Sequence, residues 1–204
     1  MEHNSSNMEP NEEIEKAAQP EDDKPNAKKN TAVSELFDWA EALVFALAIL
    51  VTVFAFVVRL SGVDGESMYP TLYNGDQLLV ASAGYTQPKR GDVVVLMADS
   101  FMAQPLVKRV IAVGGDTVTV NGESGEITVN GKTLYEPYIN ETTAFMGDRE
   151  YPLVVPKNEV FVMGDNRNRS SDSRLSEVGT IPYEKIVGKV VFRLFPFSRI
   201  GGIQ

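Results

Sequence analysis

The amino-acid sequence predicts a mainly β domain behind one N-terminal transmembrane helix. Three observations lead to this fold class. The segment Ala42–Val58 is apolar over 17 residues apart from Thr52. After it, the apolar segments are short, rich in β-branched residues and separated by turn residues, which is the pattern of strands. Two Asn-Gly pairs, at 121–122 and 130–131, mark tight turns of the hairpin type.

The N-terminal segment, residues 1–36, is rich in Asn, Glu, Lys and Pro and has neither a helical nor a strand period. Such a composition is typical of a disordered, solvated tail. Before residue 42 the chain has 4 lysines and 11 acidic residues, which account for −7 of its net charge of −9. The rest of the chain is close to neutral, so no nucleic acid is expected as a partner.

Residues 37–60 are expected to form the membrane anchor. As a helix, the apolar run spans roughly 26 Å, and Leu60 with a snorkelling Arg59 extends it toward the thickness of a hydrocarbon core. A core helix would have a polar face, and a cleaved signal peptide would have a basic start and a small-x-small site. This segment lacks the polar face of a core helix, and it lacks the basic start and the cleavage site of a signal peptide. Three lysines precede the run closely and only Arg59 follows it, which predicts a cytoplasmic N-terminus.

Residues 61–204 are numerous enough for one extracytoplasmic domain with its own core. No long amphipathic helical period appears in this part of the sequence, so the domain is predicted to be built from strands. The predicted strands are Gln77–Ser82, Asp92–Ala98, Leu106–Val113, Thr117–Val120, Glu126–Val129, Glu159–Met163 and Lys185–Leu194.

The amino-acid composition excludes several kinds of catalytic site. The chain has no cysteine, which excludes disulfides, thiolate metal sites and cysteine nucleophiles. Its one histidine, His3, lies in the tail, which excludes a Ser-His-Asp triad and a multi-histidine metal cluster. A serine nucleophile in the β domain therefore needs another base, such as a lysine kept neutral by burial.

Lys108 is the lysine whose sequence context favours burial. Strand alternation gives it the same face as Leu106, Val110 and Ala112, and an apolar face is a costly place for a charged amine. On the strand pattern alone, a snorkelling or salt-bridged lysine at a sheet edge is the commoner arrangement. The other lysines of the domain lie in turns or on partly polar strands: Lys89, Lys132, Lys157, Lys185 and Lys189.

Ser67 is the serine with the most distinctive neighbours. Gly65 allows a close backbone approach or a positive φ, and Pro70 stiffens the loop that follows. Ser67 lies nine residues after Val58, so it acts near the membrane surface. By composition alone, an ordinary turn serine is the favoured interpretation of this position.

A third candidate is the polar segment 164–174, which follows the predicted strand Glu159–Met163. Its composition is typical of a solvated loop. The alternative is a scaffold held by ion pairs such as Asp172–Arg174, which would position a site at the end of the strand.

Four segments, in this order behind the anchor, closely resemble the bacterial type I signal peptidases: GESMYPTL at 65–72, KRGDVVVL at 89–96, VKRVIAVGGD at 107–116 and GDNRNRSSDSR at 164–174. With the anchor, the resemblance covers residues 38–194. It implies a signal-peptidase-like β domain of several small antiparallel sheets. It also implies a membrane-bound serine endopeptidase, a hydrolase that uses a serine–lysine dyad and needs no metal or cofactor.

The resemblance implies a role for each matching residue. Ser67 matches the nucleophile, and Lys108 matches the general base. Ser170 matches the serine whose hydroxyl orients the lysine amine. Asp172 and Arg174 match a pair of scaffold residues behind the dyad.

Three further positions are compared with the family pattern. Arg109 matches the basic residue after the lysine. Some members have a serine two positions before the nucleophile, whose hydroxyl joins the oxyanion hole. Gly65 stands there instead, so the expected donors near it are backbone N–H groups, including that of Ser67. Many members have Asp-Asn where this chain has Asn168-Arg169, a change that alters the ion pairing of the loop.

The implied reaction is acyl transfer through an acyl-enzyme. The implied substrates are exported preproteins, whose signal peptides are cut after small residues at the first and third positions before the scissile bond. Such a segment would bind in extended form along a strand edge. Together with the anchor, this implies a single-pass protein of the plasma membrane, with preproteins and the lipid bilayer as its partners.

Two alternatives remain at this stage. Self-cleaving repressors also combine a β fold with a serine–lysine dyad, but they have a helix-turn-helix domain where this chain has an acidic tail and an apolar segment. The other alternative is a catalytically inactive, membrane-tethered β module that binds peptides. Intact Ser67, Lys108 and Ser170 argue against it.

Overall fold

The apolar N-terminal segment forms one long helix in the computed structural model, which describes residues 28–98 and 102–203. Helix α1 extends over Lys28–Val57, and within it Thr31–Ala55 is long and apolar enough to cross a membrane, with a mean hydropathy of 2.0. The helix begins before the predicted start of the anchor at residue 37, so residues 28–36 are helical where a disordered tail was expected. The rest of the predicted tail lies outside the described residues.

The predicted anchor also ends earlier than residue 60. Strand β1, Val58–Gly62, follows α1 directly and pairs antiparallel with β2, Gln77–Ala81, with Val58 opposite Ala81 and Gly62 opposite Gln77. The backbone groups of residues 58–60 therefore take part in a sheet rather than in the last turn of the helix. Val58 to Leu60 belong to the β domain.

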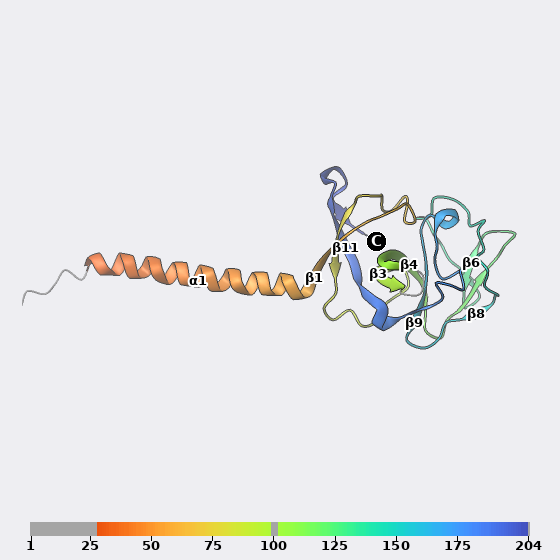
Figure 1. Ribbon diagram of the computed structural model, residues 1–204, viewed down its shortest axis with the longest axis horizontal. Coiled ribbons are helices and arrows are strands. Elements are labelled where there is room, and N and C mark those ends of the chain that lie inside the picture. The colour runs from red at the N-terminus through yellow and green to blue at the C-terminus, as the bar shows by residue number, and fades with distance from the viewer. Residues whose placement is uncertain (1–27, 99–101, 204) are drawn as a thin grey trace, which may run out of the picture. The chain divides into compact units, whose positions relative to one another are not determined.

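The rest of the chain is mainly β, as predicted, and all of its strand pairs are antiparallel (Figure 1). The larger sheet has the order β1-β2-β11-β3-β4-β9-β10, and β12 pairs with β11. Its further strands are β3 Val93–Ala98, β4 Met102–Val113, β9 Glu159–Met163, β10 Ile181–Pro182, β11 Ile186–Phe195 and β12 Gly201–Gly202.

A smaller sheet has the order β7-β6-β5-β8. Its strands are β5 Thr117–Val120, β6 Ile127–Val129, β7 Lys132–Thr133 and β8 Leu153–Val154. Three 3-10 turns complete the described elements, namely Arg167–Arg169, Tyr183–Lys185 and Phe197–Arg199.

Strand β4 changes its facing residues along its length. Leu106 and Val110 pack in the same apolar cluster, as the alternation predicts, but Ala112 packs with Ile111 against the strands of the smaller sheet. The reason is a register shift between Val110 and Ala112 in the pairing with β9, which is the signature of a β-bulge. The predicted common face is therefore correct up to Val110 and wrong for Ala112.

The loop between β1 and β2 is fixed to the core close to Ser67. Met68 and Leu72 are fully buried in one apolar cluster with Val93, Val95 and Val107. Burial of two large side chains on either side of a turn fixes its backbone, because each contributes about 1.5–3 kcal/mol. Ser67 is thus presented by a rigid loop.

Candidate active site

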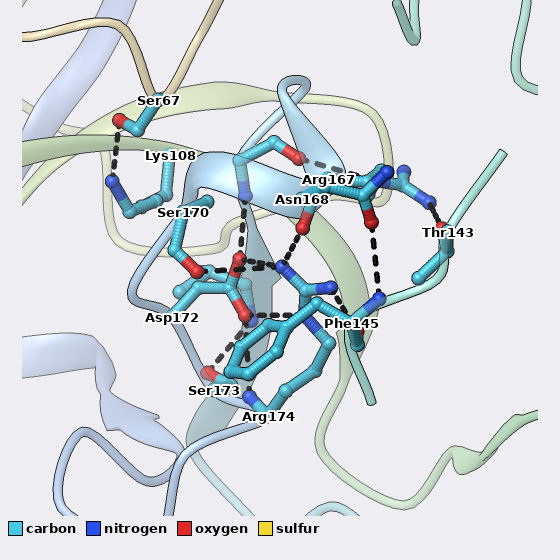
Figure 2. Close-up of polar contacts among 12 residues, drawn as sticks. Ser67, Lys108, Thr143, Phe145, Arg167, Asn168, Ser170, Asp172, Ser173 and Arg174 are labelled. Atoms are coloured by element: carbon cyan, nitrogen blue, oxygen red, sulfur yellow. Dashed lines mark hydrogen bonds and ion pairs between the residues drawn. The ribbon is translucent and has the colours of Figure 1, made fainter. Parts of the chain in front are cut away.

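The structure brings Ser67 and Lys108 into direct contact, although 41 positions separate them in the sequence. The Lys108 Nζ donates a hydrogen bond to the Ser67 Oγ at 2.7 Å (Figure 2). Lys108 lies on β4 opposite Val94 of β3 and is only 3% exposed, whereas Ser67 is half-buried. A proton can therefore move directly between the hydroxyl and the amine.

Burial changes the acidity of Lys108. The pKa of Lys108 is lowered from 10.5 to about 8, mainly because burial removes the amine from water; the charge of Asp172 opposes this shift, Arg174 adds to it and Asp165 opposes it. With a pKa of about 8, roughly one such amine in ten is neutral at pH 7, against one in a few thousand for an ordinary lysine. The other five lysines of the β domain are exposed or half-buried.

Asn166 holds the loop that presents Ser67. Its backbone N–H donates to the Ser67 carbonyl at 3.0 Å, and its Nδ2 donates to the Glu66 carbonyl at 3.0 Å. Thr71 adds a third link, because its Oγ1 donates to the Oδ2 of Asp165 at 2.5 Å. The segment after β9 therefore fixes the backbone on both sides of the nucleophile candidate.

The predicted pair Asp172–Arg174 is present and completely buried (Figure 2). The Arg174 Nε lies 2.8 Å from the Asp172 Oδ1, and Arg174 also donates to the carbonyls of Arg167 at 2.7 Å and Phe145 at 2.6 Å. Asp172 accepts the backbone N–H of Gly164 at 3.0 Å. These bonds close the loop 164–174 on itself, which agrees with a scaffold rather than a solvated loop.

Gly164 is the point where the loops of Ser67 and Ser170 meet. A Cβ at this position would lie 2.3 Å from the Ser67 carbonyl oxygen and 2.3 Å from the Ser170 Oγ. Real Cβ atoms do not approach other atoms so closely, so a side chain here would force the two loops apart. The absence of a side chain at Gly164 lets these segments approach.

Ser170 is buried close to this point, but its predicted hydrogen bond to Lys108 is not present. Its hydroxyl has no hydrogen-bond partner within the described residues. The Ser170 Oγ and the Ser67 carbonyl oxygen nevertheless both lie against Gly164, so this hydroxyl is close to the backbone of the nucleophile candidate.

Arg109 points away from the dyad and is almost fully buried. It forms two hydrogen bonds with Asp165, of 2.8 and 2.7 Å, and its guanidinium lies 4.0 Å from the centre of the Tyr138 ring. Since Asp165 also accepts from Thr71, Arg109 connects β4 to the loop of Ser67.

The backbone at Gly65 has a positive φ of 93°, which explains the glycine. Its N–H donates to the Asn74 Oδ1 at 3.0 Å and is therefore occupied. The N–H of Ser67 has no hydrogen-bond acceptor in the part of the chain that the structure describes. Of these two donors near the nucleophile, Ser67's own N–H is the available one.

The departure at Asn168-Arg169 changes the contacts of the loop. Asn168 accepts the backbone N–H groups of Ala144 and Phe145 at 2.8 and 3.0 Å. Arg169 is exposed and forms an ion pair of 3.3 Å with Glu66, the residue before Ser67. The loop thus uses an amide to bind a neighbouring segment and a surface ion pair to contact the nucleophile loop.

A pocket of about 370 Å³ opens over the dyad. It is lined by residues of the Ser67 loop, of β4 and of the loop 164–174, namely Asp64–Ser67, Gln104–Leu106, Lys108, Arg169 and Ser171. Within residues 28–98 and 102–203, no group of three or more His, Asp or Glu side chains is arranged to hold a metal ion.

The sequence pattern of the family described as signal peptidase, peptidase S26, matches residues 36–195. The chain belongs to this family. Among curated proteins, it is 36% identical to signal peptidase I of Bacillus licheniformis over 189 residues, which cover 88% of this chain and 97% of that protein. It is also 38% identical to signal peptidase I T of Bacillus subtilis, with 85% and 92% covered.

Membership confirms the predicted enzyme class, a serine endopeptidase of the signal peptidase family. A solved structure of a signal peptidase I from Enterococcus faecalis is 28% identical, with a TM-score of 0.42, and the match covers 52% of this chain and 97% of that one.

Gly164, Asp165 and Asn166 have roles at the site that the sequence analysis did not assign. All three lie in a quoted motif, directly after the strand β9. A glycine at the end of a buried strand is a signal of close backbone approach. Each of them has a partner in the Ser67 loop, about a hundred positions earlier in the chain, so only the structure identifies these contacts.

Proposed function

We propose that this chain removes N-terminal signal peptides from exported preproteins, with Ser67 as the nucleophile and neutral Lys108 as the general base. The observation that carries the proposal is the 2.7 Å contact between the Lys108 amine and the Ser67 hydroxyl, made by a lysine whose pKa burial lowers to about 8. Without histidine in the β domain, this amine is the base that the site supplies.

The reaction has two halves. Neutral Lys108 takes the Ser67 proton while the Ser67 oxygen attacks the scissile carbonyl, and the backbone N–H of Ser67 stabilises the oxyanion. As the tetrahedral intermediate collapses, the Lys108 ammonium gives its proton to the leaving amine, and the mature chain departs. Lys108 then removes a proton from water, which attacks the ester. As this second intermediate collapses, the Lys108 ammonium returns the proton to the Ser67 oxygen, and the signal peptide leaves with a free carboxylate.

The substrate binds in extended form along β4. Strand β9 pairs only with Arg109–Val113, so the half of β4 that lines the dyad pocket has no partner strand from β9. A peptide can add there as a further strand and place its small side chains over the pocket between Asp64–Glu66 and Gln104–Leu106. Small residues at the first and third positions before the cut suit this shallow site.

The surrounding residues position the dyad. Ser170 orients the Lys108 amine after a rotation of its unpartnered hydroxyl. Asp172 and Arg174 fix the loop of Ser170, and Arg109 ties β4 to the loop of Ser67 through Asp165. Gly65 gives the backbone turn that leads the chain to the oxyanion hole.

The chain crosses the plasma membrane once through α1, with the tail in the cytoplasm and the catalytic β domain outside. The length and composition of Thr31–Ala55 support the crossing. The orientation follows from the lysines on the N-terminal side of the apolar run, against Arg59 alone on the other. Such an arrangement suits substrates whose apolar segment is still in the bilayer.

The test is cleavage of a preprotein with an Ala-X-Ala site by the full chain in detergent. We expect processing at that site by the wild type and a loss of at least about a thousandfold in Ser67→Ala and Lys108→Met. Lys157→Met, which removes an exposed lysine, serves as the control and should leave the rate unchanged. Peptide binding without cleavage by folded wild type would support the inactive tethered module instead.

A further inference from the structure

A second, larger pocket of about 610 Å³ lies beside the dyad pocket. The two pockets share Glu66 and Arg169, whose ion pair stands between them on the surface. Because Glu66 directly precedes Ser67, a peptide that passes the nucleophile and crosses this ion pair enters the larger pocket.

The walls of the larger pocket combine aromatic rings with amides. The rings of Tyr69 and Tyr73 meet edge to face, with their centres 5.2 Å apart, and Leu72 lies beside them. Asn74 and Asn140 contribute amides. Apolar rings beside hydrogen-bonding groups suit a peptide segment, which presents side chains and backbone amides together.

The charged residues of the pocket differ in how they are paired. Glu66 is bound to Arg169, and Arg199 lies 2.9 Å from the buried Asp76 and over the Tyr73 ring. Glu141 is exposed and has no ion-pair partner in the described part of the chain. Its carboxylate is therefore available to attract or repel a charged side chain of a bound peptide.

We propose that this pocket binds the first residues on the mature side of the scissile bond, and that Glu141 favours a positively charged substrate side chain beside it. This inference rests on the proposed function, because the dyad pocket must hold the residues before the cut. With the dyad pocket taken by those residues, the adjoining pocket that shares Glu66 and Arg169 with it is left for the leaving chain.

The experiment measures kcat/KM for two preprotein substrates that differ only in Lys or Asp at the second residue after the cut. The kcat/KM of the Lys substrate divided by that of the Asp substrate gives a Lys-to-Asp ratio. We expect this ratio to be about fivefold lower in Glu141→Lys than in the wild type. The matched control is Glu123→Lys, which makes the same charge change at an exposed turn residue of the smaller sheet and should leave the ratio unchanged. The same Lys and Asp placed five residues before the cut should give equal ratios in all enzymes.

A second variant tests whether the substrate needs the volume of the larger pocket, rather than the charge of Glu141. Asn140→Trp fills the pocket from an exposed position. It should slow cleavage of the preprotein about tenfold, yet leave unchanged the cleavage of a signal-peptide amide with a small leaving group. Unaltered ratios in Glu141→Lys, or equal effects of Asn140→Trp on both substrates, would overturn this inference alone. Failure of the wild type to cleave either preprotein would overturn the proposed function and this inference with it.

Discussion

At the scale of single residues, the site combines a buried amine with a buried hydroxyl that has no partner. Lys108 has its hydrogen bond to Ser67, whereas the Ser170 hydroxyl has none within the described residues. An unsatisfied buried hydroxyl costs roughly 1–3 kcal/mol. A stability contribution does not explain this serine, whereas the proposed role in orienting the Lys108 amine would.

Ser170→Ala should therefore separate activity from stability. We expect kcat to fall by at least about tenfold, as part of the contribution of the general base. The melting temperature should stay the same or rise, because no hydrogen bond of the folded state is lost. Ser198→Ala, at an exposed position that does not line the dyad pocket, is the control for kcat. Equal kcat values for Ser170→Ala and wild type would exclude the orienting role.

At the scale of elements, the end of β9 determines how the loops meet. The strand leads into Gly164, where the carbonyl of Ser67 and the hydroxyl of Ser170 approach from different segments. The sequence analysis predicted β9 at its observed ends and included Gly164 in a motif. It did not assign the close approach, because that depends on a segment about a hundred positions earlier.

Gly164→Ala should damage the site through sterics alone. Its Cβ would require the Ser67 loop or Ser170 to move, so we expect a loss of about 1–3 kcal/mol in the free energy of unfolding. The rate of cleavage should fall at least about a hundredfold, since an ångström of misplacement is costly. The control is Gly201→Ala, where no atom lies within 4 Å of the new Cβ. Similar effects of the two substitutions would contradict this explanation.

The strands show which elements local sequence predicts. For six of the seven predicted strands, both the first and the last residue lie within one residue of those observed. Strand β4 ends as predicted but begins four residues earlier. The two-residue strands β7, β8, β10 and β12 are too short for a period to appear in the sequence. Strand β1 follows an apolar helix without a turn signal, so the sequence pattern places its first three residues, Val58–Leu60, in the anchor.

At the scale of the whole molecule, the buried Lys108 reduces the stability of the fold. Its pKa is lowered to about 8 in the folded chain, whereas the unfolded chain keeps the proton up to about 10.5. The unfolded state therefore binds more protons between these values, and the free energy of unfolding rises with pH in this window. Below about pH 8 the full cost of the buried charge is present.

Lys108→Met should therefore be inactive but more stable than the wild type at pH 7, by roughly 1 to 3 kcal/mol. The stability difference should shrink as the pH rises from about 8 to about 10. Denaturant unfolding of both proteins in detergent, followed at several pH values, measures it. A less stable variant at pH 7 would mean that the Lys108 ammonium is well accommodated in the folded state.

Of the contacts at the candidate site, the pair Asp172–Arg174 is predicted by the sequence, whereas the contacts that join its loops are not. The motifs contain Ser67, Lys108 and the scaffold pair, because a motif consists of residue types in a given order. The bond from Asn166 to Glu66 and the link from Arg109 through Asp165 to Thr71 were not predicted. Such contacts join distant segments, and no local period or turn signal encodes them.

The most direct test of the serine–lysine dyad is a titration of Lys108 in the full chain. Lysine labelled with ¹³C at Cε gives an NMR signal that moves as the amine loses its proton, and Lys108→Met identifies the signal of residue 108. We expect this signal to titrate with a pKa of about 8, and kcat/KM to rise with pH over the same range, because only neutral Lys108 accepts the Ser67 proton. A pKa close to 10.5 for Lys108, with cleavage independent of pH around 8, would contradict the proposed base.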